Sequence, residues 1–196
     1  MDLRALRHWI FDLDGTLTLA VHDFDALRRE LGLPLGQPIL EAVAERPPDE
    51  AQRLMRELDL IEARLIQETS AAPGASELLD ELASRSCRLG ILTRNSRENA
   101  LATLEHCGLS AHFDAADVLG RDEVRPKPHP AGILTLLGGW SADTSAAVML
   151  GDFRYDLEAG RAAGVMTVSV DPGGAHPFAS LADHCVDSLA ELVIGR

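Results

Sequence analysis

Two aspartates stand one residue apart in Phe11-Asp12-Leu13-Asp14-Gly15-Thr16, directly after the apolar run at 8–11. A carboxylate can attack phosphorus covalently, and a second carboxyl group can act as general acid and base. Asp12 is therefore the candidate nucleophile. Asp14 is the candidate that protonates the leaving oxygen and later takes a proton from the hydrolytic water. The alternative, that both aspartates only cap a turn, accounts less well for the Gly-Thr that follows them.

Groups suited to binding an anion occur further along the chain. Thr93, Arg94 and Asn95 lie at the end of a second apolar run, and Lys127 stands between two prolines that fix its backbone. Phosphoryl transfer depends mainly on positioning and on stabilising charge on the equatorial oxygens. We therefore expect these four residues to bind a substrate phosphate, with Lys127 also taking part in catalysis. Thr93 is a possible N-cap of the following helix as well.

Two further carboxylates, Asp152 and Asp156, follow a third apolar run at 146–150. Carboxylates gathered at one place raise one another's pKa and cannot all stay ionised without a cation. Oxygen ligands without a His or Cys cluster favour Mg²⁺ and disfavour zinc. The sequence therefore predicts a magnesium site beside Asp12 and Asp14.

The elements that must position these residues alternate between strand and helix from Pro73 onward. This alternation predicts an α/β fold, a three-layer Rossmann-like parallel sheet with helices on both faces, whose ligand lies at the carboxyl ends of the strands. The expected strands are 8–11, 88–93, 117–119, 146–150, 165–170 and 185–186, and the expected helices are 75–86, 98–107, 131–137, 157–163 and a short one at the C-terminus.

Residues 22–70 differ, because their apolar residues recur at helical spacing. Breaks at 32–34 and 47–48 divide this stretch into three predicted helices with no strand. We expect a Rossmann-like core of residues 1–19 and 72–196 and an inserted small all-helical cap of residues 20–71. Hinges near 18–22 and 70–74 would let the cap exclude water and select the substrate.

Taken in order, these motifs resemble those of the haloacid dehalogenase superfamily of phosphohydrolases. The stretch at 12–16 resembles the first motif, Thr93 the second, Lys127 the third and residues 151–156 the fourth. The helical insert resembles the cap of the phosphoglycolate-phosphatase-like branch, although it is short. Phe153 departs from the pattern, since many relatives carry a small hydroxyl or amide residue there.

The resemblance also implies roles for individual residues. Asp12 would be the nucleophile and Asp14 the acid and base. Asp12, the backbone carbonyl of Asp14 and Asp152 would hold Mg²⁺, and Asp156 would support the metal-bound waters or Lys127. Independently of the resemblance, His22 and His129 are expected to be ordinary surface or packing residues and not catalysts.

The activity predicted is hydrolysis of a small phosphomonoester through an aspartyl-phosphate intermediate with Mg²⁺. A phosphomutase acting on a sugar phosphate shares the first step, but it needs a cap that holds a sugar bisphosphate. A dehalogenase has no need of Asp14. A non-catalytic phospho-accepting signalling domain would place its paired acids differently and lack the insert, and a substrate-binding pseudo-enzyme would not keep every motif residue.

Composition limits the possible partners. The 196 residues carry a formal net charge of −13, which disfavours nucleic acid. No apolar run reaches the roughly 18 residues of a membrane span, and Asp2 interrupts any signal-peptide core. Three cysteines without CxxC spacing fit a reducing cytosol. We expect a cytoplasmic protein, a monomer or dimer, whose partner is a small phosphorylated metabolite.

Overall fold

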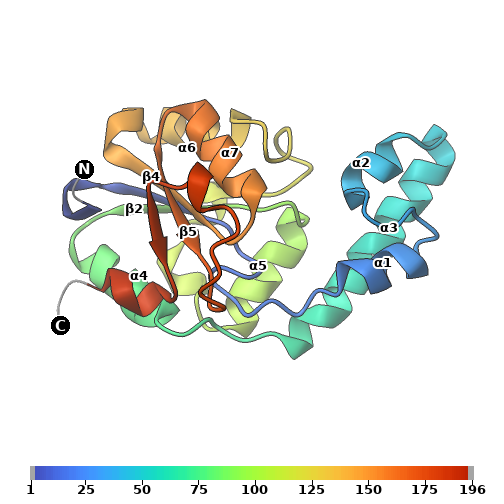
Figure 1. Ribbon diagram of the computed structural model, residues 1–196, viewed down its shortest axis with the longest axis horizontal. Coiled ribbons are helices and arrows are strands. Elements are labelled where there is room, and N and C mark those ends of the chain that lie inside the picture. The colour runs from blue at the N-terminus through green and yellow to red at the C-terminus, as the bar shows by residue number, and fades with distance from the viewer. Residues whose placement is uncertain (1–2, 194–196) are drawn as a thin grey trace.

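A computed structural model describes residues 3–193 and contains a six-stranded parallel sheet in the order β3-β2-β1-β4-β5-β6 (Figure 1). Residues 1–2 and 194–196 of the predicted core lie outside this range. The strands are β1 (His8–Phe11), β2 (Arg88–Leu92), β3 (Val118–Leu119), β4 (Ala147–Gly151), β5 (Met166–Val170) and β6 (His184–Val186). The central strands are apolar because helices cover both faces of the sheet.

The helices form the outer two layers. Trp9 and Phe11 of β1 join an apolar cluster with α4 (Ala75–Ser84) and α5 (Arg97–His106). Ile10, between them in sequence, faces the other way and packs in a second cluster with α6 (Ala131–Trp140) and α7 (Arg154–Ala163). This is the alternation of side chains along a strand, and it confirms the predicted three-layer α/β fold.

Some predicted boundaries are wrong by a few residues. α6 continues to Trp140 through Gly138 and Gly139, two poor helix formers that suggested an earlier end. Trp140 packs over Gly90, where an added Cβ would lie 2.9 Å from its ring, and it stacks on His8. The C-terminal helix is only a 3-10 helix, Leu189–Leu192.

The insert forms the predicted three helices, with an apolar cluster of their own. They are α1 (Phe24–Glu30), α2 (Ile39–Ala44) and α3 (Pro48–Leu65), followed by a 3-10 helix, Ile66–Glu68. In Figure 1 these three helices stand to one side of the sheet. The cap boundaries and hinges stay predictions. Among residues 3–193, no helix combines the length and the apolar character that crossing a membrane requires.

The two segments that join the insert to the core lie side by side. The Leu19 amide donates to the Ser70 carbonyl at 2.9 Å, and the Ala72 amide donates to the Leu17 carbonyl at 2.8 Å. This short antiparallel pairing fixes where the chain leaves the core and where it returns. It also places the helical insert over the carboxyl end of β1.

A buried arginine attaches α3 to the core. Arg121, which follows β3 and is 7% exposed, pairs with Glu62 at 2.8 Å and with Asp59, both on α3. Burial raises the pKa of Glu62, and the hydrogen bond and charge of Arg121 oppose that rise. Removing one partner of a buried pair leaves a charge without compensation, so this contact resists disruption.

We expect Arg121→Met to lower the free energy of unfolding by about 3 kcal/mol, because Glu62 is left buried without a partner. Urea denaturation measures the change. Arg121→Met/Glu62→Gln should recover part of the loss, since it removes the unpaired charge. The exposed Arg125→Met is the matched control. An unchanged unfolding midpoint in Arg121→Met would show that the pair contributes nothing to stability.

Candidate active site

The predicted site residues meet at the carboxyl ends of β1, β2 and β4. Phe11 pairs in register with Ile91 on one side and Leu150 on the other, so the residues after these strands lie level. They line a cavity of about 270 Å³ between the sheet and the insert. Its lining includes all seven predicted site residues: Asp12, Asp14, Thr93, Arg94, Asn95, Lys127 and Asp152.

Lys127 lies at the centre of the site, and its side chain is 2% exposed. Its Nζ is 2.7 Å from Oδ1 of Asp12 and 2.5 Å from Oδ1 of Asp156. Burial alone would lower the pKa of Lys127, but the two carboxylates outweigh burial and raise it. The ammonium therefore stays charged and holds Asp12 in place.

Asp156 is positioned by the first turn of α7. Its Oδ2 accepts a hydrogen bond from the Phe153 amide at 3.0 Å. An added Cβ on Gly151 would lie 2.2 Å from Asp156, so only glycine fits there. Burial, then the charge of Asp12, raises the pKa of Asp156 to about 6, and Lys127 opposes the rise. The expected contact of Asp156 with Lys127 is confirmed.

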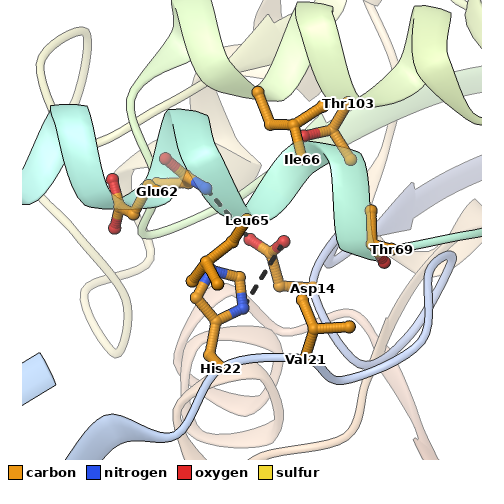
Figure 2. A pocket seen from close by; sticks show the side chains of 9 residues that line it. Asp14, Val21, His22, Glu62, Leu65, Ile66, Thr69 and Thr103 are labelled. Atoms are coloured by element: carbon orange, nitrogen blue, oxygen red, sulfur yellow. Dashed lines mark hydrogen bonds and ion pairs between the residues drawn. The ribbon is translucent and has the colours of Figure 1, made fainter. Parts of the chain in front are cut away.

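The carboxyl group of Asp14 faces the His22 ring at the base of the insert (Figure 2). Its Oδ2 accepts a hydrogen bond from Asn95 Nδ2 at 3.3 Å, and its Oδ1 is 4.0 Å from His22 Nδ1. Burial raises the pKa of Asp14, the charge of Asp12 adds to the rise, and His22 opposes it. A carboxyl group in such surroundings keeps its proton more readily than an exposed one, as a general acid must.

His22 is a packing residue, as expected, but the sequence did not predict its place beside Asp14. Its mostly buried ring faces Asp14 and stacks on Phe24 at 5.8 Å between ring centroids. His22 lies on the segment that connects β1 to α1, and nothing in its sequence neighbourhood marks it. Glu62 of α3, also missed, lines the same cavity.

Thr93 is buried, and its Oγ1 accepts a hydrogen bond from the Asn95 amide at 3.0 Å. Its predicted role as N-cap of the next helix is wrong, because Ser96 caps α5 by accepting from the Asn99 amide at 3.2 Å. The Thr93 hydroxyl hydrogen is left to donate into the cavity, as phosphate binding requires.

Arg94 connects the core to the insert. Its guanidinium donates to the Lys127 carbonyl, pairs with Glu41 of α2 at 2.6 Å, and lies 4.8 Å above the Tyr155 ring. The side-chain nitrogen of Asn95 likewise donates a hydrogen bond to Asp14. Phosphate binding by Arg94 and Asn95 stays a prediction, since both side chains already have protein partners.

Three carboxylates converge where the metal is expected. One oxygen from each of Asp12, Asp152 and Asp156 lies within 4.8 Å of the others. Burial, then the charges of Asp12 and Asp156, raises the pKa of Asp152 to about 8. The single positive charge of Lys127 therefore does not balance the three carboxylates. Their oxygen donors fit a hard divalent cation. The side chain of Asp14 lies outside this group, which leaves its backbone carbonyl as the predicted ligand.

Gly15 lets Asp152 approach β1. Its φ of +89° is a left-handed value, and an added Cβ would lie 2.5 Å from Oδ2 of Asp152. Thr16 donates from Oγ1 to Oδ1 of the same carboxylate at 3.4 Å. Gly15 and Thr16, which follow the first two aspartates, therefore help to set the position of Asp152.

Comparisons with known proteins found a matching family model, similar sequences and a similar fold. The family model described as haloacid dehalogenase-like hydrolase matches residues 9–170. A haloacid dehalogenase-like hydrolase domain-containing protein of Arabidopsis thaliana is 32% identical, over 86% of this chain and 72% of its own length. A phosphoglycolate phosphatase of Rhodospirillum rubrum is 32% identical over 88% and 83%. A hydrolase structure from Streptococcus pneumoniae superposes with a TM-score of 0.73 at 24% identity, over 97% and 98%.

We expect Mg²⁺ to stabilise the protein more at about pH 8.5 than at about pH 5.5. The pKa of Asp152 is about 8 in the folded protein, above its ordinary value of 3.8. Without metal, protonation of Asp152 therefore stabilises the folded state at low pH, and this stabilisation is lost as the pH rises through about 8. Mg²⁺ competes with that proton and stabilises the ionised site. Thermal unfolding with EDTA and with MgCl₂ measures the difference.

Asp152→Asn should abolish the Mg²⁺-dependent shift, and the exposed Asp143→Asn should keep it. A shift of equal size at both pH values would contradict binding at these carboxylates.

Proposed function

This chain belongs to the haloacid dehalogenase-like hydrolase family, and we propose that it hydrolyses a small phosphomonoester through an aspartyl-phosphate intermediate with Mg²⁺. One observation carries the proposal: Asp12 lies 2.7 Å from the buried Lys127 ammonium, while Asp14 sits in surroundings that raise its pKa. The candidate nucleophile thus stands beside a cation, and the second carboxyl group holds its proton more readily than an exposed one. The relative named phosphoglycolate phosphatase supports phosphate ester chemistry.

In the first step, an oxygen of Asp12 attacks phosphorus and the bond between phosphorus and the ester oxygen breaks. Asp14 gives its proton to the departing alkoxide, so the alcohol leaves neutral. Lys127 and the Thr93 hydroxyl donate hydrogen bonds to the phosphoryl oxygens. Lys127 can do so because its ammonium has three donors, and two are directed at Asp12 and Asp156.

In the second step, the ionised Asp14 takes a proton from a water molecule, whose oxygen attacks phosphorus. The bond between phosphorus and Asp12 then breaks, which releases inorganic phosphate and restores the free carboxylate. The same side chain is thus acid in one step and base in the next. Its hydrogen bond from Asn95 holds it in one orientation for both.

Mg²⁺ would be held by the carboxylates of Asp12 and Asp152 and by the Asp14 backbone carbonyl. When bound, the ion supplies positive charge that offsets the charge of the phosphoryl group. Asp156 is placed to orient Lys127 and lies close enough to support the metal's water ligands.

Asp12→Asn should lower phosphate release from p-nitrophenyl phosphate by about a thousandfold or more, since the amide cannot form the acyl phosphate. Circular dichroism should show an intact fold. Asp23→Asn is the matched control, because Asp23 is an exposed N-cap of α1 and asparagine also caps helices. Turnover within a few-fold of the unchanged protein would contradict the proposal.

Asp14→Asn separates the acid role from the base role. p-Nitrophenolate leaves without protonation, so its first turnover should persist as a burst while later turnovers slow. Ethyl phosphate needs a proton on its leaving oxygen, and its first turnover should fall about a hundredfold or more. Rapid-quench kinetics measures both. Equal losses for the two esters in the first turnover would argue against Asp14 as the acid.

Phosphate release also discriminates the alternative activities. A phosphomutase would interconvert sugar phosphates with little free phosphate, and a phospho-accepting signalling domain would retain phosphate on Asp12 without turnover. Product analysis after incubation with a sugar phosphate tests both in one experiment.

A further inference from the structure

Charge is unevenly distributed around the active-site cavity. Five carboxyl groups and three permanent cations line it. The carboxyl groups are those of Asp12, Asp14, Glu62, Asp152 and Asp156, and the cations are Arg28, Arg94 and Lys127. Mg²⁺ would offset charge at the phosphoryl end only. The end toward the insert keeps no surplus of positive charge for a second anionic group of the substrate.

The cations of this lining already have acidic partners. Arg28 donates to the Gln37 carbonyl at 2.6 Å and pairs with Asp25 at 2.8 Å. Arg94 pairs with Glu41 at 2.6 Å. Lys127 faces Asp12 and Asp156, and the imidazole of His22 faces Asp14. A carboxylate or second phosphate on the substrate would have to share each cation with an acidic group that already neutralises its charge.

The wall toward the insert is apolar. Leu27, Pro38, Ile39, Leu40 and Leu58 line the cavity from α1, α2, α3 and the loop before α2. Such a surface gains from contact with an apolar group and offers few partners to a sugar's hydroxyls.

Two exposed aromatic rings also line the cavity, Phe24 on α1 and Phe153 just before α7. Phe24 is 55% exposed and Phe153 is 45% exposed, although both are large apolar side chains that line the cavity. Phe153 is held edge-on against Tyr155 and Phe178, at 5.1 and 5.2 Å between ring centroids. The residue that departs from the family pattern thus presents a fixed aromatic surface beside the metal-binding end. Such a surface favours a ring that can stack on it.

The cavity has room for such a group. An apolar cavity of about 150 Å³ can bind benzene, and this one measures about 270 Å³. We infer that the substrate is a phosphomonoester of an uncharged alcohol that carries an apolar ring, and that Phe153 is a specificity-determining residue. This inference rests on the proposed function, and it excludes phosphoglycolate as the preferred substrate.

Three esters with alkyl leaving groups test the inference, because they avoid the bias of a reactive aryl phosphate. With Mg²⁺, kcat/KM for 2-phenylethyl phosphate should exceed that for ethyl phosphate about tenfold or more. Phosphoglycolate should do no better than ethyl phosphate. A preference for phosphoglycolate, or equal values for the phenylethyl and ethyl esters, would overturn the inference.

The same assay separates this inference from the proposed function. If p-nitrophenyl phosphate and all three alkyl esters release no phosphate, the proposed function fails. If ethyl phosphate is hydrolysed and the phenylethyl ester is not preferred, only the substrate inference fails.

Variants then test which side chains cause the preference for the phenylethyl ester. Phe153→Ser should lower the ratio of phenylethyl to ethyl kcat/KM about fivefold or more. Leu60→Ser is the matched control, since Leu60 is 68% exposed on α3 and does not line the cavity, and it should keep the ratio. An unchanged ratio in Phe153→Ser would remove Phe153 from the specificity role.

A second variant adds a charge instead of removing a ring. Leu40→Lys places a cation on the apolar wall and should raise kcat/KM for phosphoglycolate relative to the phenylethyl ester about tenfold. It leaves the Phe153 contacts intact, so it tests the selection against charge even if Phe153→Ser folds poorly, and Phe153→Leu, which keeps an apolar side chain but removes the ring, then tests the role of the ring. No change in relative kcat/KM would contradict an apolar wall that selects against charge.

Discussion

The buried ammonium of Lys127, shared between Asp12 and Asp156, is the interaction on which the site depends. An unpaired charge at this depth would be costly, so the lysine requires both carboxylates, and each carboxylate requires the lysine. Asp12 is fixed by the end of β1 and Asp156 by the first turn of α7. Gly151 leaves the space that brings Asp156 against the end of β4. The two ion pairs of Lys127 thus link the end of β1 to the end of β4 and the start of α7.

This pairing leaves Asp152 as the carboxylate without a cation. Burial and the neighbouring aspartates raise its pKa to about 8, and Gly15 keeps it close to β1. The same arrangement bears on how a chain of net charge −13 would bind a phosphate ester. Lys127 and a divalent ion would together balance the three carboxylates of Asp12, Asp152 and Asp156, and salt screens exposed charges that lie further than about 10 Å away.

The sequence was sufficient for the fold and for the residues at the strand ends. Parallel strands carry their carboxyl ends to one edge, so Asp12, Thr93 and Asp152 had to meet once the strands were assigned. His22, the partner of Asp14, could not be found in this way, because it lies on an irregular segment whose path depends on the pairing of two connecting segments. The Arg94–Glu41 and Arg121–Glu62 pairs were equally hidden, since each joins the insert to the core.

These contacts between the insert and the core connect the position of the insert to the inferred choice of substrate. Arg94 lines the cavity, while Arg121 lies buried against α3 outside the cavity lining. Each pairs with an acidic residue of the insert, Arg94 with Glu41 and Arg121 with Glu62. With the insert in this position, Arg94 is paired with Glu41, and apolar side chains of α1, α2 and α3 line the cavity that also contains Asp12 and Lys127. If the insert moved away, Arg94 would lose Glu41 and water would reach Asp12 and Lys127, which would weaken their charge interaction. Under the proposed function, the Arg94–Glu41 pair would therefore hold the insert in place and also withhold a cation from an anionic substrate.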